Sequence, residues 1–458
     1  MESINEHKME KTILLTAFGA ISLFCFIAIV QIGDLREHLA LYFIFSTIPF
    51  CIMLLAFRKW KFLVPGKERT AMWIVIACAI ASRISLLGLA PSLSDDLYRY
   101  IWDGRMIAHG YNPYRYSPAD TTLSQFHDDV YEHVAYKDYY SIYPPLTEMG
   151  LGASAVLSKI FFGDTAHATA AVWKFILLAA ETGTMLLLMR LLLFFGKSGK
   201  YLLLYAWHPL PIMEFAGQGH GDALMIFFLL AAITATVNKN AHLAIVGFAA
   251  SIAARGTPIV FAPVLSRSIK IKGIAAALGI ALCTFVPFYS ISALRGIFFS
   301  TSRMAQYFTF NSFGYWIIRS TFEQLKAWDY EPYIPLLLGI IFLAGIIILY
   351  RRSHGHGTSE LPKDILNICT LFVLVLWNMH PWYFTWGLAM IPLATSWAWV
   401  WITFAANFTY IHYTPHSDDV LLTIEIMEYG VFILILFWQR MNERDRHLHA
   451  INNSRNNQ

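Results

Sequence analysis

The sequence predicts an all-α membrane protein: a polytopic transmembrane helical bundle of about 11 to 14 membrane segments, some re-entrant, with a partly helical extracytoplasmic loop. Hydrophobic residues make up 57% of the 458 residues and charged residues only 14%, and the mean hydropathy is +0.50. Apolar stretches of roughly 18 residues, enough to cross about 30 Å of hydrocarbon, recur along the chain. They are too long and too uniformly apolar for barrel strands, so helices remain as the structure that satisfies the backbone in lipid.

The apolar runs set the order of the expected segments. They fall near residues 12–30, 39–57, 71–90, 143–162, 168–195, 201–215, 221–237, 242–265, 274–291, 334–350, 365–379, 384–396, 398–412 and 420–438. Run 242–265 carries Arg255-Gly256-Thr257-Pro258 in its middle, and a helix break with a charge at that depth is typical of a re-entrant or broken helix. Run 143–162 begins with Tyr143-Pro144-Pro145, and we expect it to lie along the outer face or to dip into it.

The Lys and Arg residues of the short loops indicate which side each loop faces. Basic stretches lie at 58–69, 197–200, 267–272, 351–363 and from Arg440 onward. All of them are cytoplasmic together if the two runs described above do not cross fully. Both termini are then inside, and the polar stretches 91–142, 217–222 and 379–383 face outside. We expect one membrane domain over residues 1–458, with a flexible cytoplasmic tail at 441–458.

Charge and cysteine usage exclude several classes of protein. The net charge is only +4 and the basic residues are scattered, which argues against nucleic-acid binding. The five cysteines each stand alone inside apolar segments, which argues against disulfides and zinc sites.

Residues 91–142 differ from the rest of the chain. They hold eight of its thirty acidic residues against four basic ones, and eleven of their fifty-two residues are aromatic. Disordered linkers are poor in aromatic residues, so we expect this catalytic-loop candidate to fold against the membrane surface or a ligand. Within it, Ser94 is a suitable N-cap for a helix that runs to about His109, where Gly110 ends it.

The adjacent Asp95 and Asp96 admit two interpretations. Acidic residues suit the first turn of a helix, and Asp95, Arg99 and Asp103 at spacings of four residues favour exposed ion pairs. The pair also follows directly on an apolar span and is surrounded by aromatic residues. A carboxylate at such a boundary can deprotonate a hydroxyl or hold a metal ion.

The run Ser94-Asp95-Asp96-Leu97-Tyr98-Arg99-Tyr100-Ile101-Trp102-Asp103-Gly104-Arg105, followed by Gly110-Tyr111-Asn112-Pro113-Tyr114, resembles the first extracytoplasmic loop of GT-C glycosyltransferases. The resemblance is closest to bacterial polyprenyl-phosphate-mannose-dependent mannosyltransferases and covers about residues 90–260. Tyr143-Pro144-Pro145-Leu146, the segment from His208 to Glu214, and Gly219-His220-Gly221-Asp222 support it. One departure is that the loop follows the third span here and the first span in the family, which implies two additional N-terminal helices.

The resemblance implies transfer of a hexosyl residue, with mannosyl favoured, from a polyprenyl-phosphate sugar donor to a hydroxyl of a glycan or lipid-linked acceptor. The reaction inverts the anomeric centre and takes place on the extracytoplasmic face of a bacterial plasma membrane. One of Asp95 and Asp96 is then the general base, with Asp95 favoured, and the other orients it or the sugar. Arg255 is the favoured phosphate contact, because a charge inside a membrane segment usually marks a site.

The remaining substrate-binding candidates follow from the same resemblance. They are Arg99, Trp102, Asp103, Arg105, Asn112, Tyr114, Tyr143, His220, Asp222, His380 and Trp382. Several also have structural interpretations: an Arg99–Asp103 ion pair, an Arg255–Glu181 ion pair, and Asp222 as an N-cap beside a solvated His220. No cofactor is expected; the Asp pair with a histidine is compatible with a divalent metal, but the spacing is not that of dedicated ligands.

A secondary transporter or a lipid-glycan flippase, with the acidic loop as its gate, is the alternative function. Broken helices and intramembrane charges also build transport sites. A transporter of this kind predicts two matching halves with short loops, whereas this sequence shows one 52-residue acidic loop and no internal repeat.

Overall fold

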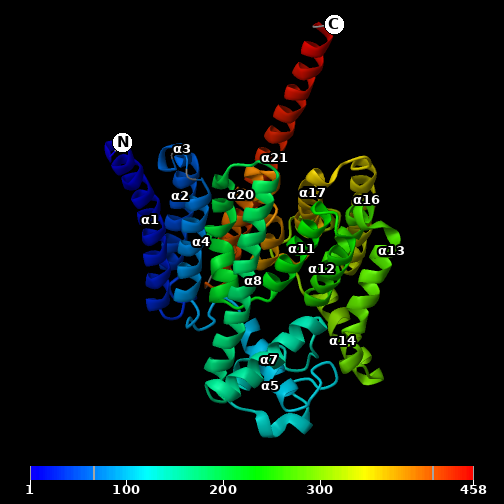
Figure 1. Ribbon diagram of the computed structural model, residues 1–458. Coiled ribbons are helices and arrows are strands. Elements are labelled where there is room, and N and C mark those ends of the chain that lie inside the picture. Colours follow the sequence, from blue (N-terminus) through cyan, green and yellow to red (C-terminus); the bar gives the residue numbers. More distant parts are fainter. Residues whose placement is uncertain (1, 65, 67, 415–416, 457–458) are drawn as a thin grey trace.

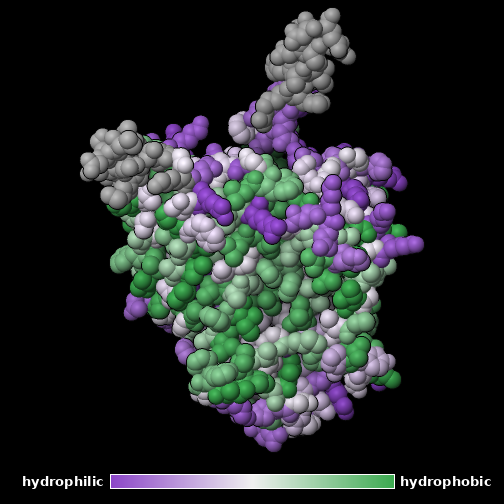
Figure 2. All heavy atoms as spheres, viewed as in Figure 1, coloured by the Kyte–Doolittle hydropathy of each residue, from purple (hydrophilic) through white to green (hydrophobic). Residues whose placement is uncertain are grey.

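The computed structural model describes residues 2–64, 66, 68–414 and 417–456, and this part of the chain is 79% helical, with no strand. The helices form one bundle (Figure 1), which confirms the all-α prediction. The start of α1 and the end of α21 lie at one end of the bundle, and α5 and α7 lie at the other. Hydrophobic side chains cover the middle of the face shown in Figure 2, and hydrophilic ones gather at the two ends. The protein is an integral membrane protein.

Within the described residues, six helices are long and apolar enough to cross a membrane. They are α1 (Glu2–Gln31), α2 (Leu39–Arg58), α8 (Ala166–Phe194), α13 (Ala262–Cys283), α16 (Ile334–Arg352) and α21 (Ser417–Asn456). α13 is kinked at Lys270, whose φ is 60°. The segment 441–458, expected to be a flexible tail, is helical as far as Asn456.

The other apolar runs form shorter pieces than the hydropathy pattern suggests. Helices of intermediate length are α4 (Glu68–Ser85), α11 (Asp222–Val237), α12 (Ala241–Ala254), α14 (Ile291–Tyr307), α15 (Phe313–Gln324), α17 (Leu361–Val375) and α20 (Trp397–Ala405). Short pieces are α3 (Trp60–Leu63), η2 (Gly199–Leu202), α9 (Leu203–Ala206), α10 (Pro209–Pro211), η3 (Ile212–Gly217), η4 (Thr257–Phe261), η5 (Val286–Phe288), η6 (Trp328–Tyr333), η7 (Thr358–Glu360), η8 (Pro381–Phe384), α18 (Thr385–Leu388), α19 (Ile391–Ala394) and η9 (Ala406–Tyr413). Runs 201–215 and 384–396 are interrupted by prolines, which remove a backbone donor and restrict the preceding residue.

The predicted helix break near Arg255 is present. α12 ends at Ala254, and after Arg255 and Gly256 the 3₁₀-helix η4 leads into α13. Arg255 has extended backbone angles, with φ −153° and ψ 84°. Arg255 is therefore not part of the helix, and its side chain can turn towards the end of the bundle where α5 lies.

The loop region 91–142 folds over that end, with α5 (Asp96–Ala108), η1 (Thr121–Phe126) and α6 (Asp129–His133). α5 begins two residues after the expected cap, but Ser94 Oγ still accepts the Asp96 N–H at 3.2 Å. α7 (Pro145–Phe161) packs beside α5 at this end (Figure 1), as expected for a run that does not cross fully. A Cβ on Gly104 would lie 2.5 Å from the Leu151 carbonyl oxygen, so only glycine permits this approach.

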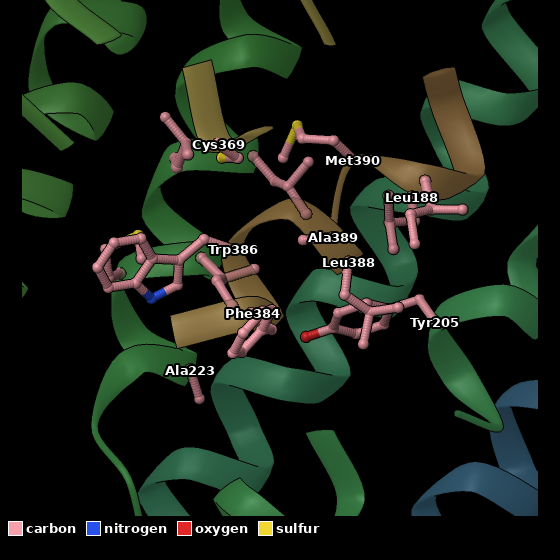
Figure 3. Close-up of a cluster of buried hydrophobic side chains, with 14 of the residues drawn as sticks. Leu188, Tyr205, Ala223, Cys369, Phe384, Trp386, Leu388, Ala389 and Met390 are labelled. Atoms are coloured by element: carbon pink, nitrogen blue, oxygen red, sulfur yellow. The ribbon is translucent and has the colours of Figure 1, made fainter. Parts of the chain in front are cut away.

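A buried hydrophobic cluster joins the helices beneath the loop region. Side chains from α8, α9, α11 and the η8–α18 segment meet there (Figure 3), among them Leu188, Tyr205, Ala223, Phe384 and Trp386. Trp386 is 2% exposed, and it is the member of the cluster that connects to the polar residues described next.

Candidate active site

A cavity of about 710 Å³ lies where the loop region 91–142 faces the bundle. Its lining comes from the start of α5, the segment 135–143, the break after α12, the end of α14 with the residues that follow it, and the segments around η8 and η9. The sequence-predicted residues among the lining are Asp95, Asp96, Arg99, Tyr143, Arg255, His380 and Trp382. Distant parts of the chain thus meet at one place, whose volume is within the range of roughly 300–1,000 Å³ that is typical of ligand sites.

Asp95 directly precedes α5, and its side chain is about half exposed. Its Oδ1 accepts a hydrogen bond of 2.5 Å from Nη2 of Arg36, which lies in the turn between α1 and α2. The Arg36 guanidinium also lies over the ring of Tyr413, 4.5 Å from its centroid. Arg36 therefore fixes one oxygen of Asp95 while the carboxylate stays on the cavity wall.

Asp96, the first residue of α5, faces different partners. Its Oδ2 is 3.8 Å from Nε2 of His220, and Ser94 Oγ lies 3.3 Å from the same nitrogen. Burial raises the pKa of Asp96 above its ordinary value, and the neighbouring charges of His220 and Arg255 oppose that rise. The two adjacent aspartates therefore have separate electrostatic environments.

Arg255 reaches the cavity beside Asp222. Its Nε lies 3.5 Å from Asp222 Oδ1, and its guanidinium lies 5.2 Å from the ring centroid of Tyr383. Asp222 Oδ1 accepts a hydrogen bond of 2.7 Å from Nε1 of Trp386, whereas Asp222 Oδ2 has no hydrogen-bond partner within the described part of the chain. The hydrophobic cluster thus positions Asp222, and Asp222 holds Arg255 by an ion pair longer than a hydrogen bond.

The model of the alpha-(1->6)-mannopyranosyltransferase family, N-terminal domain, matches residues 26–269, slightly more than half of the chain. The chain belongs to this family. Among curated proteins, none matches it at a significant level. The protein is therefore a membrane glycosyltransferase of a mannosyltransferase family, which implies a sugar donor and an acceptor. Arg36, Asp95, Asp96, Asp222 and Arg255 all lie within the matched residues.

In this mannosyltransferase, His220 is held by a buried network. Its Nδ1 lies 3.0 Å from Oε2 of Glu214 and 3.2 Å from the Glu214 carbonyl oxygen. Glu214 Oε1 accepts a hydrogen bond of 2.7 Å from the Tyr410 hydroxyl. His220 and Glu214 are fully buried. The network orients the imidazole so that Nε2 points to Asp96.

The second feature around His220 is a row of stacked rings. Its ring lies 3.9 Å from the ring of Trp382 at 18° between planes. Trp382 stacks on His380 at 4.4 Å and 1°, and His380 stacks on Phe310 at 4.5 Å and 16°. The four rings pack face to face in a row beside the charged groups, and Trp382, His380 and Phe310 of this row line the cavity.

The other predicted residues serve mainly to hold the loop region together. The ion pair between Arg99 and Asp103 is present, with Arg99 Nε 2.9 Å from both Asp103 oxygens. Seven predicted residues do not line the cavity, among them Asp103, His220 and Asp222, whose partners are given above. Of the other four, Trp102 packs against His127 and Tyr131, Arg105 pairs with Asp128 at 2.7 Å, Asn112 donates to the Phe288 carbonyl at 2.7 Å, and Tyr114 donates to the Tyr143 carbonyl. Arg105, Asn112 and Tyr114 thus make these hydrogen bonds within the protein.

Three structural interpretations from the sequence are wrong. The ion pair of Arg99 with Asp103 is buried, not exposed, and Asp95 pairs with Arg36. Glu181 does not pair with Arg255, because Arg83 donates to Glu181 Oε2 from Nε at 2.9 Å and from Nη2 at 2.7 Å. His220 is not solvated, and the N-cap of α11 is Gly221, so Asp222 is the first residue of the helix.

Sequence reasoning missed Arg36, Tyr413 and the role of Glu214. Arg36 belongs to a charged turn between the first two apolar runs, and the expected topology places that turn on the same side as residues 91–142. This signal was sufficient to suggest it as a partner for the aspartates. Nothing in the local sequence around Tyr413 or Tyr410 marks them, because their role depends on packing against η3 and the turn after α1.

Among the residues that the structure describes, no group of three or more His, Cys, Asp or Glu side chains is placed so that it could hold a metal ion. Asp96, His220 and Asp222 are near one another, but His220 is already held by Glu214 and Asp222 by Trp386.

Proposed function

We propose that the protein transfers a mannosyl residue from polyprenyl-phosphate mannose to a hydroxyl of a glycan or lipid-linked acceptor, with inversion. The observation that carries the proposal is the cavity in which Asp95 and Asp96 face the same space as Arg255. This arrangement offers a base for an attacking hydroxyl and a cation for a departing phosphate. The name of the family includes an α-(1→6) linkage, which supports our assignment of the attacking group to the primary hydroxyl of a hexose unit in the acceptor.

Asp95 is the general base in this proposal. Arg36 holds its Oδ1, so Oδ2 is the oxygen that we assign to the acceptor proton. The acceptor oxygen attacks the anomeric carbon as its proton passes to Asp95. The bond from that carbon to the phosphate oxygen breaks, and the phosphate leaves with the electron pair. An α-linked product formed with inversion requires mannose that is β-linked to phosphate in the donor.

Asp96 and Arg255 act on the donor side. In an inverting reaction the base and the leaving group are on opposite faces of the sugar. Asp96 lies towards His220 and Arg255, whereas Asp95 lies towards Arg36 and Tyr413. We therefore propose that Arg255 binds the phosphate of the donor. Asp96 then orients the donor sugar by accepting hydrogen bonds from the hydroxyls of that sugar.

The membrane side follows from charge. The basic stretches after α2 and α16 are at the end of the bundle away from α5 and α7 (Figure 1). The positive-inside rule then supports an extracytoplasmic cavity. We propose a bacterial plasma membrane as its location from the resemblance of the loop region alone. A polyprenyl chain would remain in the lipid while its phosphate enters the cavity at the membrane boundary.

The proposal is tested by transfer from polyprenyl-phosphate mannose in membranes that carry Asp95→Asn or Asp96→Asn. We expect Asp95→Asn to lower the transfer rate by about 10²- to 10⁴-fold, the usual contribution of a general base, and Asp96→Asn to lower it less. Asp120→Asn is the matched control, since Asp120 caps η1 in the same loop region and asparagine caps equally well.

Wild-type turnover by both Asp95→Asn and Asp96→Asn would refute the assignment of the base. Transfer from a nucleotide sugar alone, in proteoliposomes free of polyprenol, would refute the donor class. The alternative function, a transporter or flippase, predicts that neither substitution changes any transfer reaction.

A further inference from the structure

A second cavity, of about 450 Å³, adjoins the first. Thr309, Phe310 and His412 line both. The rest of its lining comes from α15, from η9 and from the part of α21 near the same end of the bundle: Asn311, Ser312, Tyr315, Trp316, Arg319, Thr409, Leu421, Leu422 and Glu425. The reaction proposed above involves none of these residues.

The lining has the chemistry of a carbohydrate site. Trp316 and Tyr315 are among the lining residues, and the apolar face of a sugar can stack on such rings; the Arg319 guanidinium lies over one face of Trp316, 5.5 Å from its centroid. Arg319 and Glu425 offer charged groups for hydroxyls, although Arg319 is also 3.3 Å from Glu323 and from Glu331. Glu425 is on a membrane-spanning helix, where a carboxylate is costly and usually marks a site.

Asn311 supplies an independent indication of a ligand. The residue is 5% exposed, and its side-chain Nδ2 donates to Glu428 Oε2 at 3.2 Å. Its backbone carbonyl oxygen accepts from the Tyr429 hydroxyl at 2.7 Å. Asn311 Oδ1, however, has no hydrogen-bond partner among the residues described by the structure. A fixed, buried and unpaired acceptor on a cavity wall costs free energy unless a ligand donor satisfies it.

The wall between the two cavities is anchored by the backbone of Phe310. Its N–H donates to the Trp377 carbonyl at 3.1 Å, and its carbonyl accepts from the Met379 N–H at 2.7 Å. The ring of Phe310 stacks on His380, in the first cavity, and lies edge-on to His412 at 5.6 Å. His412 is next to Tyr413 in the chain, and the Arg36 guanidinium lies over the Tyr413 ring. Because Arg36 also donates to Asp95, His412 lies on the same side of the first cavity as Asp95.

We infer that the second cavity is an acceptor chamber, which binds a mannose-containing glycan and delivers its terminal hydroxyl past His412 to Asp95. The inference rests on the proposed function, because it takes Asp95 as the base and Arg255 as the phosphate contact. The donor then occupies the first cavity from the Arg255 side, and the acceptor enters from the opposite side. This is the arrangement that inversion requires.

The test uses the full-length enzyme in lipid nanodiscs, with polyprenyl-phosphate mannose as donor and an alkyl α-(1→6)-mannobioside as acceptor. Trp316→Ala should raise the KM for the mannobioside by roughly tenfold or more and leave the donor KM within about twofold. Glu425→Gln should act in the same direction. Slow release of mannose from the donor to water, measured without acceptor, should be unchanged by both.

Trp328→Ala is the matched control, since Trp328 is an exposed tryptophan on η6 that lines neither cavity. Trp316→Phe keeps a ring at the site and should recover most of the acceptor affinity, which separates stacking from misfolding. A raised donor KM with an unchanged acceptor KM would assign the cavity to the donor and overturn the inference. Unchanged values for both substrates would overturn it as well.

Failure of the proposed function gives a different result. Wild-type enzyme that transfers no mannose from polyprenyl-phosphate mannose would refute the donor class before any chamber variant is measured. Transfer by the wild-type enzyme that Asp95→Asn abolishes, together with a normal acceptor KM in Trp316→Ala, would refute the chamber alone.

Discussion

Two of the protein's buried arginine–carboxylate pairs differ in how completely their polar atoms are satisfied. Arg83 on α4 and Glu181 on α8 are almost fully buried, at 0% and 1% exposed. Arg83 also donates to the carbonyls of Ala79 and Ala206 at 3.1 and 3.0 Å, and Glu181 accepts a hydrogen bond from Tyr205. This pair is closed, with partners on both of its members.

Arg255 and Asp222 form the open counterpart. The two are 3.5 Å apart, Arg255 is 16% exposed on the cavity wall, and Asp222 Oδ2 is without a hydrogen-bond partner in the described residues. Burying a charge is costly in either place, and the closed pair recovers that cost within the protein. The open pair keeps binding capacity for a ligand. A buried charge in this family member thus indicates a site only where its hydrogen bonds are incomplete.

The largest expected effect is on the closed pair. Arg83→Met leaves Glu181 buried without a cation, which should lower the free energy of unfolding by about 3–5 kcal/mol. Thermal unfolding in detergent measures this loss, and transfer activity per folded molecule should be unchanged. The double substitution Arg83→Met with Glu181→Leu should recover most of the stability. A transfer rate that falls in the folded fraction of Arg83→Met would erase the distinction between the two pairs.

The next effect is on the open pair. Arg255→Gln should raise the KM for polyprenyl-phosphate mannose by about 10- to 100-fold, the equivalent of one or two hydrogen bonds to a charged group. The KM for the acceptor should change little, and the unfolding temperature should stay close to that of the wild type. Arg58→Gln, at an exposed arginine in the last turn of α2, is the control for loss of an arginine. Equal changes in both KM values would remove the phosphate role of Arg255.

The smallest effect is on pH dependence. Burial raises the pKa of Asp96 above its ordinary value of 3.8, and Arg255 and His220 oppose the rise. Because the proposed reaction needs Asp96 ionised, activity is present above this raised pKa and is lost as the pH falls through it. Arg255→Gln removes an opposing cation, so the acidic limb of kcat/KM should move to higher pH. A limb that stays in place would show that Asp96 does not titrate in the reaction.

The sequence predicted some elements well because the signal was local. Ser94 and the acidic first turn predicted the start of α5, and the Arg255-Gly256-Thr257-Pro258 break predicted the end of α12. Long apolar runs predicted helices, but they did not predict whether each helix is continuous. Run 201–215 consists of the end of the 3₁₀-helix η2, the two short helices α9 and α10, and most of the π-helix η3. Prolines and close packing decide that outcome, and hydropathy averages do not record it.

Composition and motif alone determined that this chain is a helical membrane protein with an acidic, aromatic-rich loop and a pair of aspartates at its start. These features depend on residues near one another in the chain, where helix caps, apolar periodicity and charge bias act. Only the tertiary structure assigned the partners: Arg36 to Asp95, Glu214 to His220, and Arg83, not Arg255, to Glu181. The physical reason is that a buried charge takes the partner that packing brings within hydrogen-bond distance, and several arginines and carboxylates in this chain were chemically equivalent choices.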